Sequence, residues 1–181
     1  MAIAPVELKD IEVLIPAIDI TARIRSLAKQ IAIAFPQDLM IICLLRGSFI
    51  FTSDLIRALH WEGRQPQLDF MTLASYGKEK TSSGQVQLVK DIAELVEGRD
   101  VLIVDDILES GRTLSFAREL LRKRGARTVK TAVLLEKVGK RVVDIQADFV
   151  GFEIDDSFVV GYGLDFANFY RELPFIGVLP T

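Results

Sequence analysis

The stretch VLIVDDILESGRT at residues 101–113 decides the fold of this chain. Its apolar run, 101–104, is typical of a strand that is buried on both faces of a sheet. This run delivers Asp105 and Asp106 to the carboxyl end of the strand, and a short loop with Ser, Gly and Thr then opens a helix over 113–123. Ligands of open α/β sheets bind just outside the carboxyl ends of strands, and helix N-termini attract phosphate. We therefore predict that this loop holds a phosphate group.

The two aspartates also have a simpler interpretation, as acids that the dipole of the following helix favours. Neighbouring residues of a strand point to opposite faces, so at least one of Asp105 and Asp106 needs a polar partner. The chain contains neither a G-x-x-x-x-G-K-[ST] string nor a G-x-G-x-x-G string. These absences argue against a P-loop nucleotidase and against a dinucleotide site.

Apolar patterns on both sides of this stretch predict that helices and strands alternate along one α/β domain of residues 1–181. The predicted helices are about 17–35, 49–59 and 113–123. The predicted strands are 39–45, 67–74, 101–104, 129–135, 149–154, 158–162 and 175–179. Two of these strands and the helix between them form a βαβ unit, which implies a parallel sheet. We expect Ser48 to cap the second helix.

Residues 76–84, YGKEKTSSG, are a polar stretch with no residue that would join a core. A returning strand begins near Val86, so residues 67–91 are expected to form a long hairpin. We predict that the 76–84 loop at its tip is mobile.

The composition excludes several classes of protein. The 181 residues are 50% hydrophobic and 26% charged, which is typical of one globular domain. The apolar runs fall far short of the roughly 20 residues of a membrane span, and the first ten residues carry no basic leader. We therefore expect a cytoplasmic protein with no membrane partner. The net charge of −3 does not favour a nucleic-acid partner.

The chain has one cysteine, Cys43, and one histidine, His60. A single cysteine excludes an internal disulfide and a thiolate zinc cluster. The apolar neighbours of Cys43 indicate a buried strand residue rather than a reactive thiol. His60 follows a helical pattern, and we interpret it as a surface or helix-end residue.

The stretch at 101–113 resembles the 5-phosphoribosyl pyrophosphate (PRPP) signature of the type I phosphoribosyltransferases. Three further segments are similar to the purine-salvage branch, the hypoxanthine-guanine phosphoribosyltransferases: LLRGSFIFTSDLIRAL at 44–59, LLEKV at 134–138, and DFVGFEIDDSFVVGYGLDFANFYRELPFIGVL at 148–179. The resemblance covers nearly the whole chain from about Asp38 onward. It implies a central, mostly parallel sheet flanked by helices, with a small hood and a mobile loop.

The resemblance also implies a reaction and a set of site residues. A Mg²⁺-dependent enzyme would convert hypoxanthine or guanine and PRPP into IMP or GMP and pyrophosphate. The residues implied for PRPP and its phosphates are Arg46, Gly47, Asp105, Asp106, Glu109, Ser110, Gly111, Arg112, Thr113 and Arg171. Those implied for the purine are Lys137, Phe158, Val159 and Asp165. Those implied for the metal are Asp165, Asp105 and Asp106. Ser75 and Tyr76 match the start of the mobile lid.

Within this set, Lys137 would reach the exocyclic oxygen of a 6-oxopurine, Phe158 would stack on the base, and Val159 would offer backbone groups to its edge. Leu45-Arg46-Gly47 matches a pyrophosphate loop whose non-proline peptide can be cis. Taken alone, Lys137 would be a surface lysine at a strand end. Residues 45–47 would be a plain turn between strand and helix.

Glu109 departs from the family, which usually has an aspartate at this position as the proposed general base. Glutamate keeps the carboxylate but adds a methylene, which moves the oxygens by roughly 1 to 1.5 Å, comparable with the tolerance of a catalytic hydrogen bond. We still expect an active enzyme in which Glu109 is the catalytic base.

Two other functions stay open on the sequence. A pyrimidine-operon RNA-binding regulator shares the DD-x-x-x-[ST]-G-R-T signature, although it would need a basic face. The net charge and the LLEKV and FVVGYGLDF segments argue against it. A catalytically weak PRPP or nucleotide sensor is the second alternative, and Glu109 keeps it open. Because members of the family form dimers and tetramers, we expect a homodimer or homotetramer.

Overall fold

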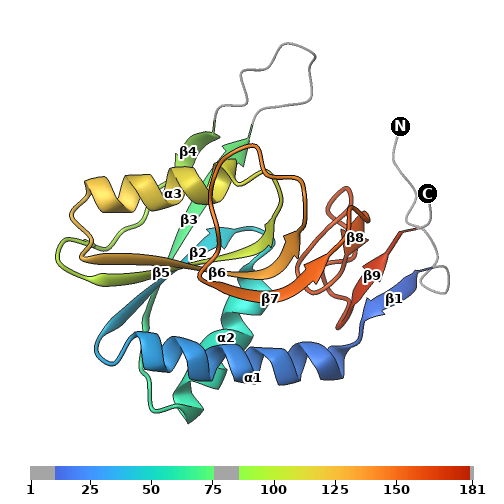
Figure 1. Ribbon diagram of the computed structural model, residues 1–181, viewed down its shortest axis with the longest axis horizontal. Coiled ribbons are helices and arrows are strands. Elements are labelled where there is room, and N and C mark those ends of the chain that lie inside the picture. Colours follow the sequence, from blue (N-terminus) through green and yellow to red (C-terminus); the bar gives the residue numbers. More distant parts are fainter. Residues whose placement is uncertain (1–10, 76–85, 180–181) are drawn as a thin grey trace.

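A six-stranded sheet forms the centre of the computed structural model, which describes residues 11–75 and 86–179 (Figure 1). Its strands, in spatial order, are β4 (Val86–Lys90), β3 (Gln67–Ser75), β2 (Leu39–Leu45), β5 (Asp100–Leu108), β6 (Thr128–Lys137) and β7 (Phe149–Ile154). All neighbouring pairs are parallel except β3 and β4. The predicted mostly parallel sheet is confirmed.

Helices cover both faces of this sheet. In Figure 1, α1 (Ala17–Ala34) and α2 (Phe49–Trp61) lie on one side, and α3 (Arg112–Lys123) lies on the other. Alternate residues of β5 pack into different cores: Leu102 and Val104 belong to the cluster with α1 and α2, whereas Val101 and Ile103 belong to the cluster with α3. The period of two along a strand therefore explains why the run 101–104 is apolar throughout. None of the helices among the described residues is long and apolar enough to cross a membrane.

A smaller antiparallel sheet forms the hood beside the central sheet. It contains β1 (Glu12–Ile15), β9 (Ile176–Val178) and β8 (Val159–Val160), in the order β1-β9-β8. The sequence did not predict β1, because only the last of its four residues is buried and its partner β9 lies at the other end of the chain. β8 and β9 are shorter than the predicted strands 158–162 and 175–179.

Two local predictions need correction. Ser48 precedes α2 but makes no side-chain cap bond, and its hydroxyl donates instead to the carbonyl of Leu44. The strand predicted to end at Val104 continues through both aspartates to Leu108. The hairpin of β3 and β4 is confirmed, with Ser75 opposite Val86. The predicted mobile loop 76–84 lies outside the described residues.

Candidate active site

The carboxyl ends of β2 and β5 meet at one edge of the central sheet and frame a cavity of about 310 Å³. Residues 44–47 and 105–111, together with Thr113 and Leu114, line it. This is the edge at which parallel α/β sheets bind ligands. The structure thus brings the predicted pyrophosphate loop and the predicted phosphate loop to one cavity.

Asp105 and Asp106 lie within β5, ahead of α3, so they are not helix-entry acids. Asp105 is buried, and its carboxylate accepts the backbone N–H of Asp106 at 3.0 Å. The Asp106 carboxylate accepts the N–H of Ile107 at 2.8 Å. Burial raises the pKa of both carboxyls, and for Asp105 the charge of Asp106 raises the pKa further. Burial and mutual repulsion therefore disfavour the doubly charged state of the pair.

Gly47 lets the loop after β2 pack directly on Asp106. A Cβ built at Gly47 would lie 1.5 Å from Asp106 Oδ2, a distance that no side chain tolerates. The preceding Leu45-Arg46 peptide is cis, as the resemblance allows. A Cβ at Gly163 would lie 2.0 Å from the carbonyl oxygen of Gly47, so the hood touches this loop from the other side. Glycine at positions 47 and 163 therefore allows the loop after β2, Asp106 of β5 and the hood to pack closely together.

The hood contributes two of the predicted charged residues, Asp165 and Arg171. Arg171 Nη2 lies 2.5 Å from Asp165 Oδ1, and Arg171 Nη1 donates to the carbonyl of Gly163 at 2.6 Å. Arg171 is close enough for its charge to lower the pKa of Asp106, against the raising effect of burial. Arg46 Nη1 donates to Asn168 Oδ1 at 3.4 Å, on the same turn of the hood. Two cations therefore flank the cavity where a pyrophosphate is predicted.

The predicted phosphate loop turns into α3 at Gly111. Gly111 has a φ of 83°, and a Cβ there would lie 2.5 Å from Ile145 Cγ2. Only glycine meets both conditions without strain. The first turn of any α-helix has backbone N–H groups without intrahelical partners, and Thr113 lies in that turn of α3. These free N–H groups are of the kind that bind anions, and the binding of a phosphate at this loop stays a prediction.

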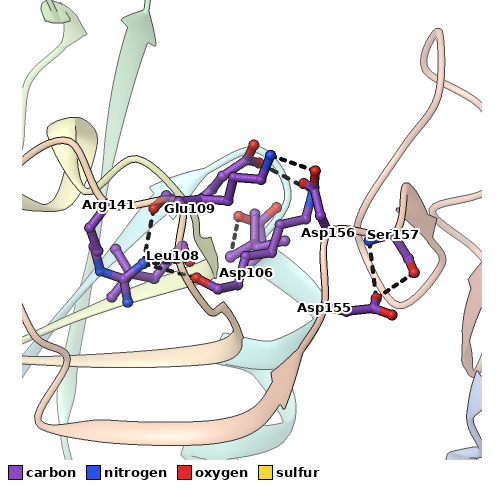
Figure 2. Close-up of polar contacts among 10 residues, drawn as sticks. Asp106, Leu108, Glu109, Arg141, Asp155, Asp156 and Ser157 are labelled. Carbon is purple, nitrogen blue, oxygen red and sulfur yellow. Dashed lines mark hydrogen bonds and ion pairs between the residues drawn. The ribbon is translucent and has the colours of Figure 1, made fainter.

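Lys137 is not a surface lysine, because only 7% of it is exposed. Its ammonium lies 3.4 Å from Glu109 Oε2 and 3.8 Å from Asp156 Oδ1. Figure 2 shows Glu109 and Asp156 approaching the same region from the end of β5 and from the segment after β7. Asp156 also pairs with Lys140 at 2.5 Å, and this contact lowers the pKa of Asp156. The resemblance named Lys137 and Glu109, but sequence reasoning missed Asp156, whose only signal was its place in an acidic pair after a strand.

Val159 begins β8, and Phe158 directly precedes it. Phe158 is 52% exposed, and its ring makes an edge-to-face contact with Phe166 at a centroid distance of 5.6 Å. An exposed ring held by a second ring is suited to stack on a planar ligand. Val159 is buried and pairs with Val178 of β9. Ser75 ends β3, whereas Tyr76 lies outside the described residues.

The carboxylates of the site suit a hard cation. Among residues 11–75 and 86–179, no group of three or more His, Cys, Asp or Glu side chains could hold a metal ion without help. Mg²⁺ is commonly held by one or two carboxylates together with substrate oxygens. Asp105 and Asp106 offer such carboxylates next to the cavity. The donor set therefore fits a metal that arrives with a phosphorylated substrate.

A sequence model described as the phosphoribosyl transferase domain matches residues 17–167. The chain belongs to this family. This phosphoribosyltransferase is 45% identical over 172 residues to the hypoxanthine-guanine phosphoribosyltransferase of Bacillus subtilis, covering 94% of each chain. It is 44% identical over 171 residues to the hypoxanthine phosphoribosyltransferase of Salmonella typhimurium, covering 92% of this chain and 94% of the relative.

A solved structure of a hypoxanthine phosphoribosyltransferase from Staphylococcus aureus matches with a TM-score of 0.90 and 39% identity. The match covers 99% of this chain and 97% of that chain. The predicted type I phosphoribosyltransferase fold is confirmed.

Proposed function

We propose that this phosphoribosyltransferase acts in purine salvage and transfers the 5-phosphoribosyl group of PRPP to hypoxanthine or guanine, giving IMP or GMP and pyrophosphate. The observation that carries the proposal is the buried Lys137 ammonium beside the Glu109 carboxylate, 3.4 Å apart at the edge of the cavity. A 6-oxopurine presents O6 and N7 side by side on one edge. When the free base carries its proton on N7, O6 accepts and N7–H donates, so the Lys137 ammonium and the Glu109 carboxylate suit that edge.

PRPP has an anion at each end of one sugar, and the site offers two separate cation-rich or amide-rich regions. The loop from Ser110 to Thr113 would bind the 5-phosphate through the first turn of α3. Arg46, which bonds to Asn168, and Arg171, which bonds to the carbonyl of Gly163, would face the pyrophosphate. Asp105 and Asp106, between these regions, would accept the ribose hydroxyls.

The reaction breaks the bond between the anomeric carbon and a pyrophosphate oxygen, and it forms a bond from that carbon to a ring nitrogen of the base. Glu109 would accept the proton that the purine loses, while Lys137 would donate to O6. Phe158 would stack on the base and Val159 would bind its edge through the backbone. Fixed positive charge from Arg46 and Arg171 would stabilise the leaving pyrophosphate.

Asp105 and Asp106 would hold Mg²⁺ together with substrate oxygens, and the bound ion would neutralise charge on the pyrophosphate. The resemblance also assigns Asp165 to the metal, although no three such side chains among the described residues lie together as a metal site. Because burial raises the pKa of Asp105 and Asp106, cation binding should release a proton from the pair. Asp165 pairs with Arg171 in the present structure, so these two residues respond together to a bound anion and cation.

Three further features complete the proposal. The resemblance assigns a lid to the segment that begins at Ser75 and Tyr76, and after Ser75 this prediction falls on residues outside the described part of the chain. We place the enzyme in the cytoplasm and expect it to be a homodimer or homotetramer. The comparisons give no support to the RNA-binding alternative.

A turnover assay tests the function directly. The protein is incubated with PRPP, Mg²⁺ and one base at a time from hypoxanthine, guanine, xanthine, adenine and uracil, and nucleotide is measured. We expect turnover with hypoxanthine or guanine. Faster turnover with adenine or uracil would overturn the proposal. Tight PRPP binding without turnover on any base would instead support the sensor alternative.

A further inference from the structure

Arg141 lies on the segment between β6 and β7, outside the motifs that carry the resemblance, and no role has been assigned to it so far. Its side chain is only 21% exposed. Figure 2 shows it beside Leu108 and Glu109, at the end of β5. An arginine that is largely removed from water needs partners for its N–H groups, so the identity of those partners indicates what the side chain does.

The guanidinium of Arg141 binds the ends of two neighbouring strands at once. Nη1 donates to the carbonyl of Leu108 at 3.1 Å and to that of Glu109 at 2.9 Å, and it lies 3.5 Å from the carbonyl of Lys137. Nη2 pairs with the carboxylate of Glu136. Nε donates to the carbonyl of Ile145 at 3.1 Å, which holds the arginine on its own segment.

These bonds begin where the sheet ladder stops. The last register pair between β5 and β6 is Leu108 with Glu136. Glu109 and Lys137 follow directly, and the ladder does not fix the backbone of one against the other. Arg141 contacts the carbonyls of both residues and so continues the connection by one position. The 3.4 Å separation between the Glu109 carboxylate and the Lys137 ammonium depends on that connection.

The backbone next to Arg141 supports the same loop. The N–H groups of Val142 and Val143 donate to the carbonyl of Ser110 at 3.1 and 3.3 Å. These bonds hold the start of the phosphate loop without the arginine side chain. Loss of the guanidinium alone should therefore disturb Glu109 and Lys137 more than it disturbs the phosphate loop.

We propose that Arg141 is a positioning residue, which sets the spacing of Glu109 and Lys137 for the purine by bridging the ends of β5 and β6. The role needs a planar fork with several donors, which lysine cannot supply from a single ammonium. The inference rests on the proposed roles of Glu109 and Lys137. It adds that the purine half of the site is assembled by a residue that touches neither substrate.

The test compares Arg141→Ala and Arg141→Lys with the unchanged enzyme, with Arg122→Ala as a matched control at an exposed arginine of α3. We expect kcat for hypoxanthine to fall about 10- to 100-fold in both Arg141 variants, because a misplacement of about 1 Å can cost that much. The Kd of PRPP should change less than threefold. Glu136→Gln, which removes the charged partner but leaves the carbonyl bonds, should lose less than threefold in kcat.

Two further measurements separate positioning from a general loss of structure. Added methylguanidinium should restore part of the kcat of Arg141→Ala in a saturable way, and it should have no effect on Glu109→Gln. The double variant of Arg141→Ala and Glu109→Gln should lose less than the product of the two single losses, because the part of the Arg141 effect that acts through Glu109 is already gone.

A kcat within twofold of the unchanged enzyme in Arg141→Lys would overturn the proposal, and so would an equal loss in PRPP binding or additive losses in the double variant. If Arg141→Ala does not fold, Arg141→Lys and its double variant with Glu109→Gln decide the matter by the same criteria. Absence of purine transfer by the unchanged enzyme would overturn the proposed function instead, so the two failures are distinguishable.

Discussion

Replacement of Gly47 by alanine should separate substrate binding from folding at the predicted pyrophosphate loop. The new Cβ would lie 1.5 Å from Asp106 Oδ2 and 2.6 Å from Asp106 Cγ, whereas ordinary contacts begin near 3.4 Å. The gap must therefore open by about 1.9 Å. Either the loop after β2 lifts away from the sheet or the Asp106 side chain leaves its present position.

The expected cost follows from these two movements. Overpacking of this kind costs about 1–3 kcal/mol of unfolding free energy, and for a chain of this size Tm falls by roughly 2–4 °C per kcal/mol. Displacement of Asp106 removes a charge-assisted hydrogen bond to the proposed ribose hydroxyl, worth about 1.5–3 kcal/mol. The Kd of PRPP should therefore rise on the order of 10- to 100-fold.

The assay pairs differential scanning calorimetry with titration calorimetry of PRPP in the presence of Mg²⁺. Gly98→Ala is the matched control, because Gly98 has a φ of +69° and no atom within 4 Å of the added Cβ. That variant should lose stability through backbone strain alone and bind PRPP normally. If Gly47→Ala binds PRPP within twofold of the unchanged protein, the packing of Gly47 on Asp106 does not serve the substrate, and the reasoning fails.

Three other substitutions test separate parts of the site. In steady-state kinetics, Glu109→Gln should lower kcat about 10²- to 10⁴-fold while PRPP binding changes little, and Glu109→Asp should stay active. A Glu109→Gln variant as fast as the parent would show that Glu109 is a structural residue and not the base. Lys137→Met should reduce the preference for hypoxanthine over adenine at least tenfold, measured as a ratio of kcat/KM values; an unchanged ratio would remove Lys137 from base recognition. Asp105→Asn should raise the free energy of unfolding at pH 7, because a carboxyl whose pKa is raised on folding destabilises the folded protein at pH values above the pKa of that carboxyl in the unfolded chain. In urea titrations, this gain in unfolding free energy should shrink as the pH falls toward about 4. A gain that grows toward acid pH would contradict the raised pKa of Asp105.

The central sheet could be predicted from the sequence because its strands carry local signals. The run 101–104 is apolar at every position since its two faces join different cores, and the fixed order of strand, helix and strand makes the pairing of β5 with β6 parallel. β1 had no such signal, because residues 12–14 are exposed and the strand exists only through its pairing with β9. The prediction that Ser48 caps α2 was wrong, because the buried Ser48 hydroxyl donates to the carbonyl of Leu44 instead.

The candidate site was only partly predictable. Lys137 and Glu109 lie in segments that match family motifs, so the resemblance supplied them. Asp156 lies within the matching segment 148–179 but was not singled out there, and Arg141 lies in the connection between β6 and β7. Their contacts with Lys137 and Glu109 arise only when the ends of β5, β6 and β7 meet at one edge. Neither hydrophobic periodicity nor motif spacing predicts these contacts, since they form between side chains from different strand ends that lie close together only in the folded sheet.

The most direct test of the account is the ratio of kcat/KM for hypoxanthine to kcat/KM for adenine, measured on the unchanged protein with saturating PRPP and Mg²⁺. Lys137 is 7% exposed, and its ammonium, placed to donate to O6, should reject an amino group at that position because two donors would then face each other in a buried site. Sites built around such a hydrogen bond discriminate by about 10⁴ to 10⁵. We predict a ratio above about 10³. A ratio near one, or a preference for adenine, would contradict the assignment of the Lys137–Glu109 pair to the 6-oxopurine edge.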